Sequence, residues 1–171
     1  MADNKHEAAA SVVAVLATAI IYFGEMVVAL MLAIFLLSTA TFSIGEPVAL
    51  FFGGVVALTL GEYTVHRFLL HNSATSQHRI HHARPNEAID KIFWQIWVCF
   101  AVVYVIAGGV VLAGVLVAYA WYLLIHYCAH HRPDILPPSL LKHHTDHHSF
   151  ANRNYGVTTT LWDHVFRTIL R

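Results

Sequence analysis

Histidine is the residue type in this chain that could do chemistry, because 14 of the 171 residues are histidine and most of them lie in tight clusters. A neutral imidazole offers one ring nitrogen to a metal ion and is a strong ligand for iron, zinc and copper. So many imidazoles can lie close together without a large free-energy cost only where they bind cations. The sequence therefore predicts a polynuclear metal site made of histidines. The four clusters are His66-Arg-Phe-Leu-Leu-His71, His78-Arg-Ile-His81-His82, His126-Tyr-Cys-Ala-His130-His131 and His143-His144-Thr-Asp-His147-His148.

The spacing within the clusters indicates how histidines could share a metal ion. His126 and His130 are four residues apart, and His78 and His81 are three residues apart. On a helix, such pairs lie on one face. Each pair could therefore hold one metal or line one side of a site.

Adjacent histidines indicate a second ion. His81 and His82 diverge by about 100° on an α-helix, so one of them could serve one metal and its neighbour another. His66 and His71 diverge by about 140° on the same reckoning, which suits either two different metals or a local unwinding of the helix. The set favours a pair of ions held by helix ends over one tetrahedral zinc.

The composition places this site at a membrane. The chain is 57% hydrophobic and 12% charged, with a mean hydropathy of +0.58. Because a helix needs about 20 apolar residues to cross a bilayer, we expect an all-α integral membrane protein. It would be a single domain over residues 1–171, with a four-helix transmembrane bundle and a cytoplasmic, histidine-rich helical cap that holds two metals. The expected spans are residues 8–37, 48–64, 92–107 and 110–127, the last two forming a hairpin at Gly108-Gly109.

The distribution of charge agrees with four crossings. All ten Lys and Arg residues fall on the side of the expected bundle that carries the histidines, and the loops at 38–47 and 108–109 contain none. The positive-inside rule then puts the histidine site on the cytoplasmic face. The formal net charge is zero, so nothing indicates a surface for nucleic acid.

Histidines also serve roles outside catalysis, and each role has its own requirements. Burial in an apolar core accounts for a single histidine, not for four clusters at helical spacing on one side of a membrane. A structural zinc site uses four ligands, often cysteines. A metal transporter places ionisable ligands near the bilayer midplane, where Glu25 is the one expected charge. A metal-binding or metal-transport membrane protein without redox chemistry stays as the non-enzymatic alternative.

Sequence motifs add a family resemblance over about residues 55–171. The run Gly61-Glu-Tyr-Thr-Val-His66-Arg-Phe-Leu-Leu-His71 resembles the first histidine box of the fatty acid hydroxylase superfamily, which includes sterol desaturases. The later boxes follow in the family's order, and the ending Asn154-Tyr-Gly-Val-Thr-Thr-Thr-Leu-Trp-Asp163-His-Val-Phe-Arg-Thr168 resembles its closing signature. Within the superfamily the chain is most similar to fatty acid 2-hydroxylases.

The resemblance implies a membrane-embedded di-iron enzyme. Such an enzyme uses dioxygen and two electrons to hydroxylate an acyl chain of a fatty acid or membrane lipid, with no catalytic residue beyond the metal centre. Two iron ions are the implied cofactors, and zinc is an alternative occupant in isolated protein. Carried over box by box, the implied ligands are His66, His71, His78, His81, His82, His126, His130, His144, His147 and His148.

Two further histidines leave the ligand set open. His131 and His143 adjoin matched boxes but fall outside the matched spacing. His143 rivals His144, because it lies four residues before His147. Both are therefore alternative ligands.

Three carboxylates are candidates to orient the ligand rings through hydrogen bonds. Glu62 lies one turn before His66, Asp146 lies inside the fourth box and Asp163 belongs to the closing signature. For each acid the competing interpretation is a solvated or helix-capping carboxylate.

Substrate and electron supply are the remaining questions. Carotenoid hydroxylation and sterol-type oxidation are the alternative oxidase activities. The chain has no dinucleotide-binding fingerprint and no Cys-x-x-Cys pair, so we expect a separate ferredoxin-like or haem-type electron donor. An acidic donor would dock on the basic residues of the histidine face, namely Arg79, Arg84, Lys91, Arg132 and Lys142.

Overall fold

Helices make up most of the residues that the computed structural model describes, which are 2–41, 45–71, 76–85 and 93–170. No strand occurs in these ranges, so the all-α prediction is confirmed. The elements in chain order are α1 (Ala2–Thr39), α2 (Glu46–Thr64), the π-helix η1 (Val65–Leu70), α3 (Ser76–Ala83), α4 (Phe93–His131), the 3-10 helix η2 (Pro133–Ile135), α5 (Pro138–Ser149) and α6 (Leu161–Val165).

Three helices are long and apolar enough to cross a membrane, rather than the four expected. They are Ala19–Thr39, Glu46–Leu70 and Trp94–His131. The difference arises at the third, because the described residues of the two spans expected at 92–107 and 110–127, which are 93–107 and 110–127, lie within the single element α4. The four crossings and the cytoplasmic side of the histidines stay predictions.

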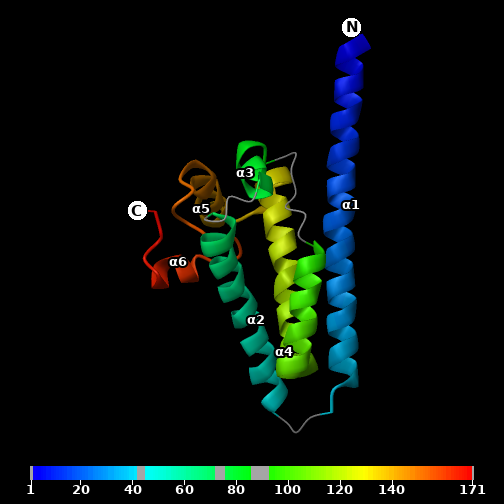
Figure 1. Ribbon diagram of the computed structural model, residues 1–171, viewed down its shortest axis with the longest axis vertical. Helices are drawn as coiled ribbons and strands as arrows, with labels where there is room; N and C mark the ends of the chain where they lie inside the picture. The colour runs from blue at the N-terminus through cyan, green and yellow to red at the C-terminus, as the bar shows by residue number, and fades with distance from the viewer. Residues whose placement is uncertain (1, 42–44, 72–75, 86–92, 171) are drawn as a thin grey trace.

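Gly108 bends α4 back on itself. Its backbone has φ 83° and ψ 175°, which is not helical and which glycine adopts more readily than any other residue. The two arms of α4 lie side by side and run in opposite directions (Figure 1). A hairpin at this point is what the paired glycines predicted.

The bundle is held together mainly by α4, which packs against both α1 and α2. Between α2 and α4 the backbones approach closely: a Cβ added to Gly54 would lie 2.1 Å from the carbonyl oxygen of Val111, and one added to Gly114 would lie 2.0 Å from that of Phe51. Small residues at such crossings are typical of membrane helices.

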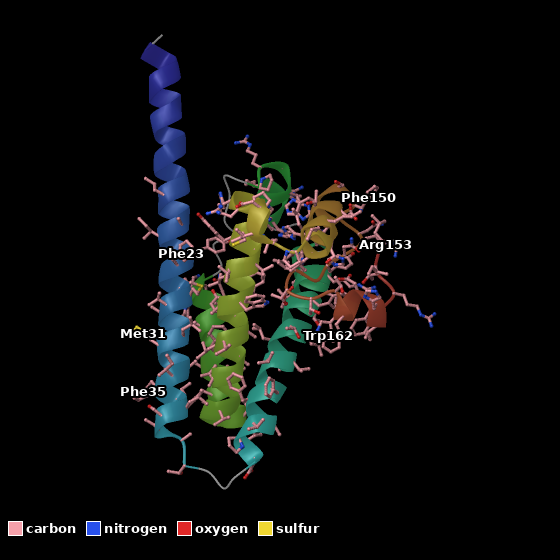
Figure 2. All side chains as sticks on the ribbon, turned by 180° about the vertical axis from the view of Figure 1, so that it is seen from behind. Phe23, Met31, Phe35, Phe150, Arg153 and Trp162 are labelled. Atoms are coloured by element: carbon pink, nitrogen blue, oxygen red, sulfur yellow. The ribbon has the colours of Figure 1, made fainter. Side chains whose placement is uncertain are left out.

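The outer face of α1 is apolar. Met31 and Phe35 point away from the other helices (Figure 2) and are 65% and 59% exposed. Phe23 is 42% exposed, although its ring centre lies 5.2 Å from that of Tyr127 in α4. An exposed apolar face of this length suits lipid better than water. The buried side of α1 contributes Ala29 and Ala33 to the core, where both are fully buried.

A helical cap covers one end of this bundle. The short helices α3, α5 and α6 gather beside the end of α2 and the end of α4, although they come from distant parts of the chain (Figure 1). The segment after α5 returns to α2, where the indole Nε1 of Trp162 donates to Thr59 Oγ1 at 3.1 Å. The cap brings all four histidine clusters to the same end of the molecule.

Candidate metal centre

Two groups of histidines converge inside the cap. In each group one ring nitrogen per residue lies within 4.8 Å of the others. The first group draws on η1 and its end, α3 and α5, and the second draws on α3, α4 and α5. The first group is His66, His71, His78, His82 and His147, and the second is His81, His126, His130 and His144.

His148 lies beside the second group. Its Nε2 is 3.2 Å from Nε2 of His144, and its ring centre is 4.9 Å from those of both His81 and His130. The ten histidines implied by the family resemblance are therefore all gathered in one place, divided between two neighbouring groups.

The Nε2 atoms of the first group face one another. Nε2 of His78 lies 3.2 Å from that of His66, 2.9 Å from that of His71 and 3.1 Å from that of His82. Nε2 of His71 is in turn 3.1 Å from that of His147. A neutral imidazole has only one N–H, so several of these nitrogens meet lone pair to lone pair.

The second group has the same geometry. Nε2 of His126 is 3.0 Å from that of His81, and Nε2 of His144 is 2.9 Å from that of His130. Two ligands that each lie about 2.1 Å from one ion at a right angle are about 3.0 Å apart. Both groups thus fit one transition-metal ion each, which would also remove the repulsion between the lone pairs.

The π-helix η1 accounts for how His66 and His71 reach the same group. The backbone N–H of His71 donates to the carbonyl of His66 at 3.3 Å, five residues back instead of four. This wider turn brings residues five apart onto one face. Of the two alternatives in the sequence, the structure has the local unwinding, which brings both rings into one group.

Spacing of four, not three, brings histidines into one group. His78 and His82 share the first group, and His126 and His130 share the second. By contrast, His78 and His81, three apart, belong to different groups. Of the two alternatives for this pair, lining one side of a shared site agrees with this grouping, whereas holding one metal together does not. Neighbours such as His81 and His82 lie in different groups.

Backbone carbonyls orient two rings of the first group. Nδ1 of His66 donates to the carbonyl of Tyr155 at 2.5 Å, and Nδ1 of His147 donates to that of Arg153 at 2.7 Å. With the proton on Nδ1, the Nε2 lone pair points into the group as a ligand would. Tyr155 is part of the closing signature, which was the only sequence signal for this contact.

Burial keeps the rings outside the membrane segments uncharged. Desolvation, together with the neighbouring histidines, lowers the pKa of His71 and of His82 to about 4, and that of His147 and of His148 to about 3. At neutral pH these imidazoles are unprotonated, which is the form that binds metals.

The carboxylates expected beside the rings bind elsewhere. Glu62 accepts hydrogen bonds from the backbone N–H and the hydroxyl of Thr158, at 3.2 and 2.5 Å, and from the N–H of Val157 at 2.5 Å. Asp146 pairs with Lys142 at 2.6 Å. Neither contacts a ring of the two groups in the described residues, so the expectation that they orient a ring directly is wrong.

Asp163 is fully buried and organises the loop that follows α5. It accepts hydrogen bonds from the N–H groups of Tyr155 and Gly156 at 2.9 and 2.8 Å, from Thr168 Oγ1 at 2.7 Å and from His143 Nε2 at 3.1 Å. Burial alone raises the pKa of Asp163, but these hydrogen bonds outweigh it and leave the pKa below its ordinary value. Glu62 and Asp163 thus hold the loop whose Tyr155 carbonyl orients His66.

The two alternative ligands lie outside both groups. His143 is buried against Asp163, and the ring of His131 packs at 4.7 Å on that of Tyr127. Sequence reasoning also missed Tyr22 and Tyr122, whose hydroxyl groups each lie 3.4 Å from Nδ1 of His126. No spacing in the sequence connects Tyr22 to that histidine, because α1 is packed against α4 only in the fold.

A histidine-rich cap on a membrane-length helical bundle is the arrangement of a known family. The sequence profile described as "Fatty acid hydroxylase" matches residues 51–168, and the chain belongs to that family. This confirms the resemblance found in the motifs.

Individual proteins similar to this chain are hydroxylases of fatty acids or fatty acyl groups by name. The chain is 32% identical over 140 residues to a dihydroceramide fatty acyl 2-hydroxylase of Arabidopsis thaliana, covering 68% of this chain and 58% of that protein. It is 30% identical over 162 residues to the fatty acid 2-hydroxylase of Homo sapiens, covering 77% of this chain and 43% of that one. The chain thus spans about half the length of these curated relatives.

A solved structure has the same fold. The structure described as full-length scs7p, with only the hydroxylase domain visible, matches with a TM-score of 0.65 and 28% identity, and the match covers 93% of this chain and 66% of that chain.

Proposed function

We propose that this protein is a membrane-bound, dioxygen-dependent di-iron hydroxylase that acts on an acyl chain of a fatty acid or membrane lipid. The observation that carries the proposal is the convergence of ten histidine side chains as two adjacent groups at the end of a membrane-length bundle. The names of its relatives, fatty acid and dihydroceramide fatty acyl 2-hydroxylases, support the acyl chain as substrate.

The ten histidines are the proposed ligands, His66, His71, His78, His82 and His147 for one iron and His81, His126, His130, His144 and His148 for the other. Bound iron with nitrogen ligands supplies the oxidation of an unactivated C–H bond by dioxygen. The protein holds the rings in the ligating tautomer, through the carbonyls of Tyr155 and Arg153 in the first group. It also shields the site, since His147 is fully buried.

The position of the site suits a substrate that never leaves the bilayer. His126 and His130 belong to the last turns of the membrane-length helix α4, directly above its apolar core. An acyl chain inserted among the helices could present one carbon to the cap while its remainder stays in lipid. We infer four crossings, with the two arms of α4 as the last pair, and the cap on the cytoplasmic side.

Electrons would come from a separate ferredoxin-like or haem-type donor that docks on the basic residues of the cap. Two of the expected cations are already paired in the structure, Arg132 with Asp134 at 2.9 Å and Lys142 with Asp146 at 2.6 Å. Lys91 lies outside the described residues. This weakens the positive charge of the proposed docking face without removing it, since Arg79 is exposed on the same cap.

The test is lipid analysis by mass spectrometry of cells that express the protein and cells that do not. We expect fatty acids or acyl lipids that have gained one oxygen atom, in amounts that depend on iron and on a reductant. The gain of oxygen in carotenoids or sterols instead would contradict the acyl substrate. Bound metal without any oxygenated product would support the non-enzymatic alternative.

Variants connect the activity to the metal groups. His130→Ala and His147→Ala should each abolish the product and lower bound metal, since each removes one proposed ligand. His131→Ala is the matched control, because that neighbouring ring packs on Tyr127 outside both groups. Full metal content and activity in His130→Ala would refute the assignment of that ligand.

A further inference from the structure

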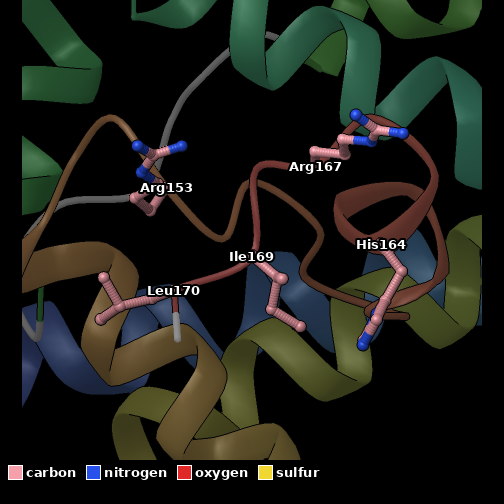
Figure 3. A pocket seen from close by; sticks show the side chains of 5 residues that line it. All are labelled: Arg153, His164, Arg167, Ile169 and Leu170. Carbon is pink, nitrogen blue, oxygen red and sulfur yellow. The ribbon is translucent and has the colours of Figure 1, made fainter.

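A cavity of about 600 Å³ opens on the cap, and its lining residues include none of the histidines of the two groups. It is lined by Arg153, His164, Arg167, Ile169 and Leu170 (Figure 3). Three of these five side chains are basic and none is acidic. Neither arginine is engaged in an ion pair in the part of the chain that the structure describes. A concave surface with unpaired guanidinium groups attracts an anion, and the planar fork of arginine suits phosphate oxygens in particular.

Arg167 occupies a backbone position where glycine is the usual residue. Its φ is 56°, in the left-handed region, directly after α6. The N–H of Thr168 donates to the carbonyl of Asp163 at 2.8 Å, and the N–H of Arg167 to that of His164 at 3.3 Å. This is the helix-ending motif whose left-handed residue is most often glycine. An arginine there costs backbone free energy that a glycine would not.

One wall of the cavity belongs to α6, which supplies His164 and packs on a membrane-length helix. That helix is α2, and α6 packs on it through Trp162, whose Nε1 donates to Thr59, and through Phe166, whose ring stacks on that of Tyr63 at 5.1 Å. On its other side α6 exposes Leu161 and Val165, which are 53% and 56% accessible. Apolar side chains beside arginines are typical of a segment at the surface of a bilayer.

The walls of the cavity are fixed by the same loop that supports the metal groups. The N–H of Leu170 donates to Asn154 Oδ1 at 2.7 Å, and the N–H of Asn154 donates to the carbonyl of Thr168 at 3.0 Å. The carbonyl of Arg153 accepts the hydrogen bond from His147. Arg153 therefore faces the cavity with its side chain while its backbone orients a ring of the first group.

We propose that this cavity binds the phosphate group of an anionic membrane lipid at the bilayer surface. Arg153 and Arg167 would hold the phosphate oxygens, and the exposed apolar side of α6 would lie along the acyl chains. The proposal rests on the membrane location of the bundle and not on its enzymatic activity.

The experiment counts phosphatidylglycerol molecules retained by the detergent-solubilised protein in native mass spectrometry. We expect one retained lipid, with about tenfold weaker retention in Arg153→Gln and in Arg167→Gly, since each loses a charge-assisted contact. Arg167→Gly is informative because glycine suits the left-handed backbone at this position, so the fold is kept while the guanidinium is removed. Arg132→Gln removes a charge from the same end of the molecule but not from the cavity, and it should retain lipid as the parent protein does.

Three outcomes would overturn the proposal. The first is equal retention of phosphatidylglycerol by all variants. The second is equal retention of diacylglycerol, which lacks the phosphate. The third is displacement of the lipid by inorganic phosphate at the same concentration, which would indicate a site for a soluble anion. Bound metal is measured on the same samples. Unchanged metal content shows that the centre is intact, so a failure here leaves the proposed function untouched.

Discussion

Single imidazole rings in the cap are held neutral by burial and by one another. The pKa values of His71 and His82 are lowered to about 4 and those of His147 and His148 to about 3, whereas an unfolded chain takes up protons on histidine near its ordinary pKa. Between about pH 6.5 and 4 the unfolded state therefore binds more protons than the folded state, and stability rises with pH through this window.

The corresponding prediction is acid sensitivity. Lowering the pH from 7 to 5 should lower the melting temperature of the metal-free protein in detergent, because unfolding then becomes coupled to protonation of these rings. The metal-loaded protein should lose its metal over the same range, since protons compete with the ions for Nε2. A melting temperature of the metal-free protein that rises on acidification would contradict the prediction.

The geometry and packing of whole helices determine which histidines lie in the same group. The sequence predicted that the clusters converge, because the spacing of histidines along a helix and the placement of all Lys and Arg residues on one side of the expected bundle can both be read directly from it. It left two alternatives for His66 and His71, and the structure has the local unwinding, in the π-helix η1. Nor could it decide whether His78 and His81 hold one metal or line one side of a site, because the rotation of α3 relative to its neighbours depends on packing that no short motif encodes.

The loop after α5 leads to a prediction at this scale. Glu62→Ala removes the acceptor for the N–H groups of Val157 and Thr158, and an unsatisfied buried donor costs about 1–3 kcal/mol. We expect a lower melting temperature and faster loss of metal to a chelator, because the loop also carries the Tyr155 carbonyl that orients His66.

Asp146→Ala is the matched control for this carboxylate. Its partner Lys142 is exposed, and exposed ion pairs contribute about 1 kcal/mol or less. Equal metal loss from the two variants would mean that the loop does not support the metal centre. Glu62→Gln should restore much of the stability, since the amide oxygen can still accept a hydrogen bond.

For the whole molecule, the sequence predicted the helical class, the membrane and the family, and each is seen in the structure or the comparisons. The number of crossings could not be fixed from the sequence in the same way. Whether α4 counts as one helix or two depends on the single bend at Gly108, and an apolar run has the same composition whether it is straight or folded back.

Topology can be measured by labelling single cysteines. In a background where Cys99 and Cys128 are replaced by serine, Thr41→Cys and Asn152→Cys should react with a membrane-impermeant thiol reagent from opposite sides of the membrane. Both native positions are exposed, so the label can reach them. Reaction from the same side would contradict the orientation proposed for the cap and the α1–α2 connection.

The division of neighbouring histidines between the two groups has a consequence for metal loading. His81 and His82 are adjacent on α3, yet they belong to different groups, and His147 of the first group adjoins His148 beside the second. An ion bound in one group therefore fixes the helices that supply ligands to the other. The second ion then binds to a site that is already ordered, so its binding costs less conformational entropy.

Metal binding should therefore be cooperative. Metal titrated into metal-free protein should give empty and doubly loaded molecules in native mass spectra. Accumulation of a singly loaded species at half saturation would mean that the two groups fill independently.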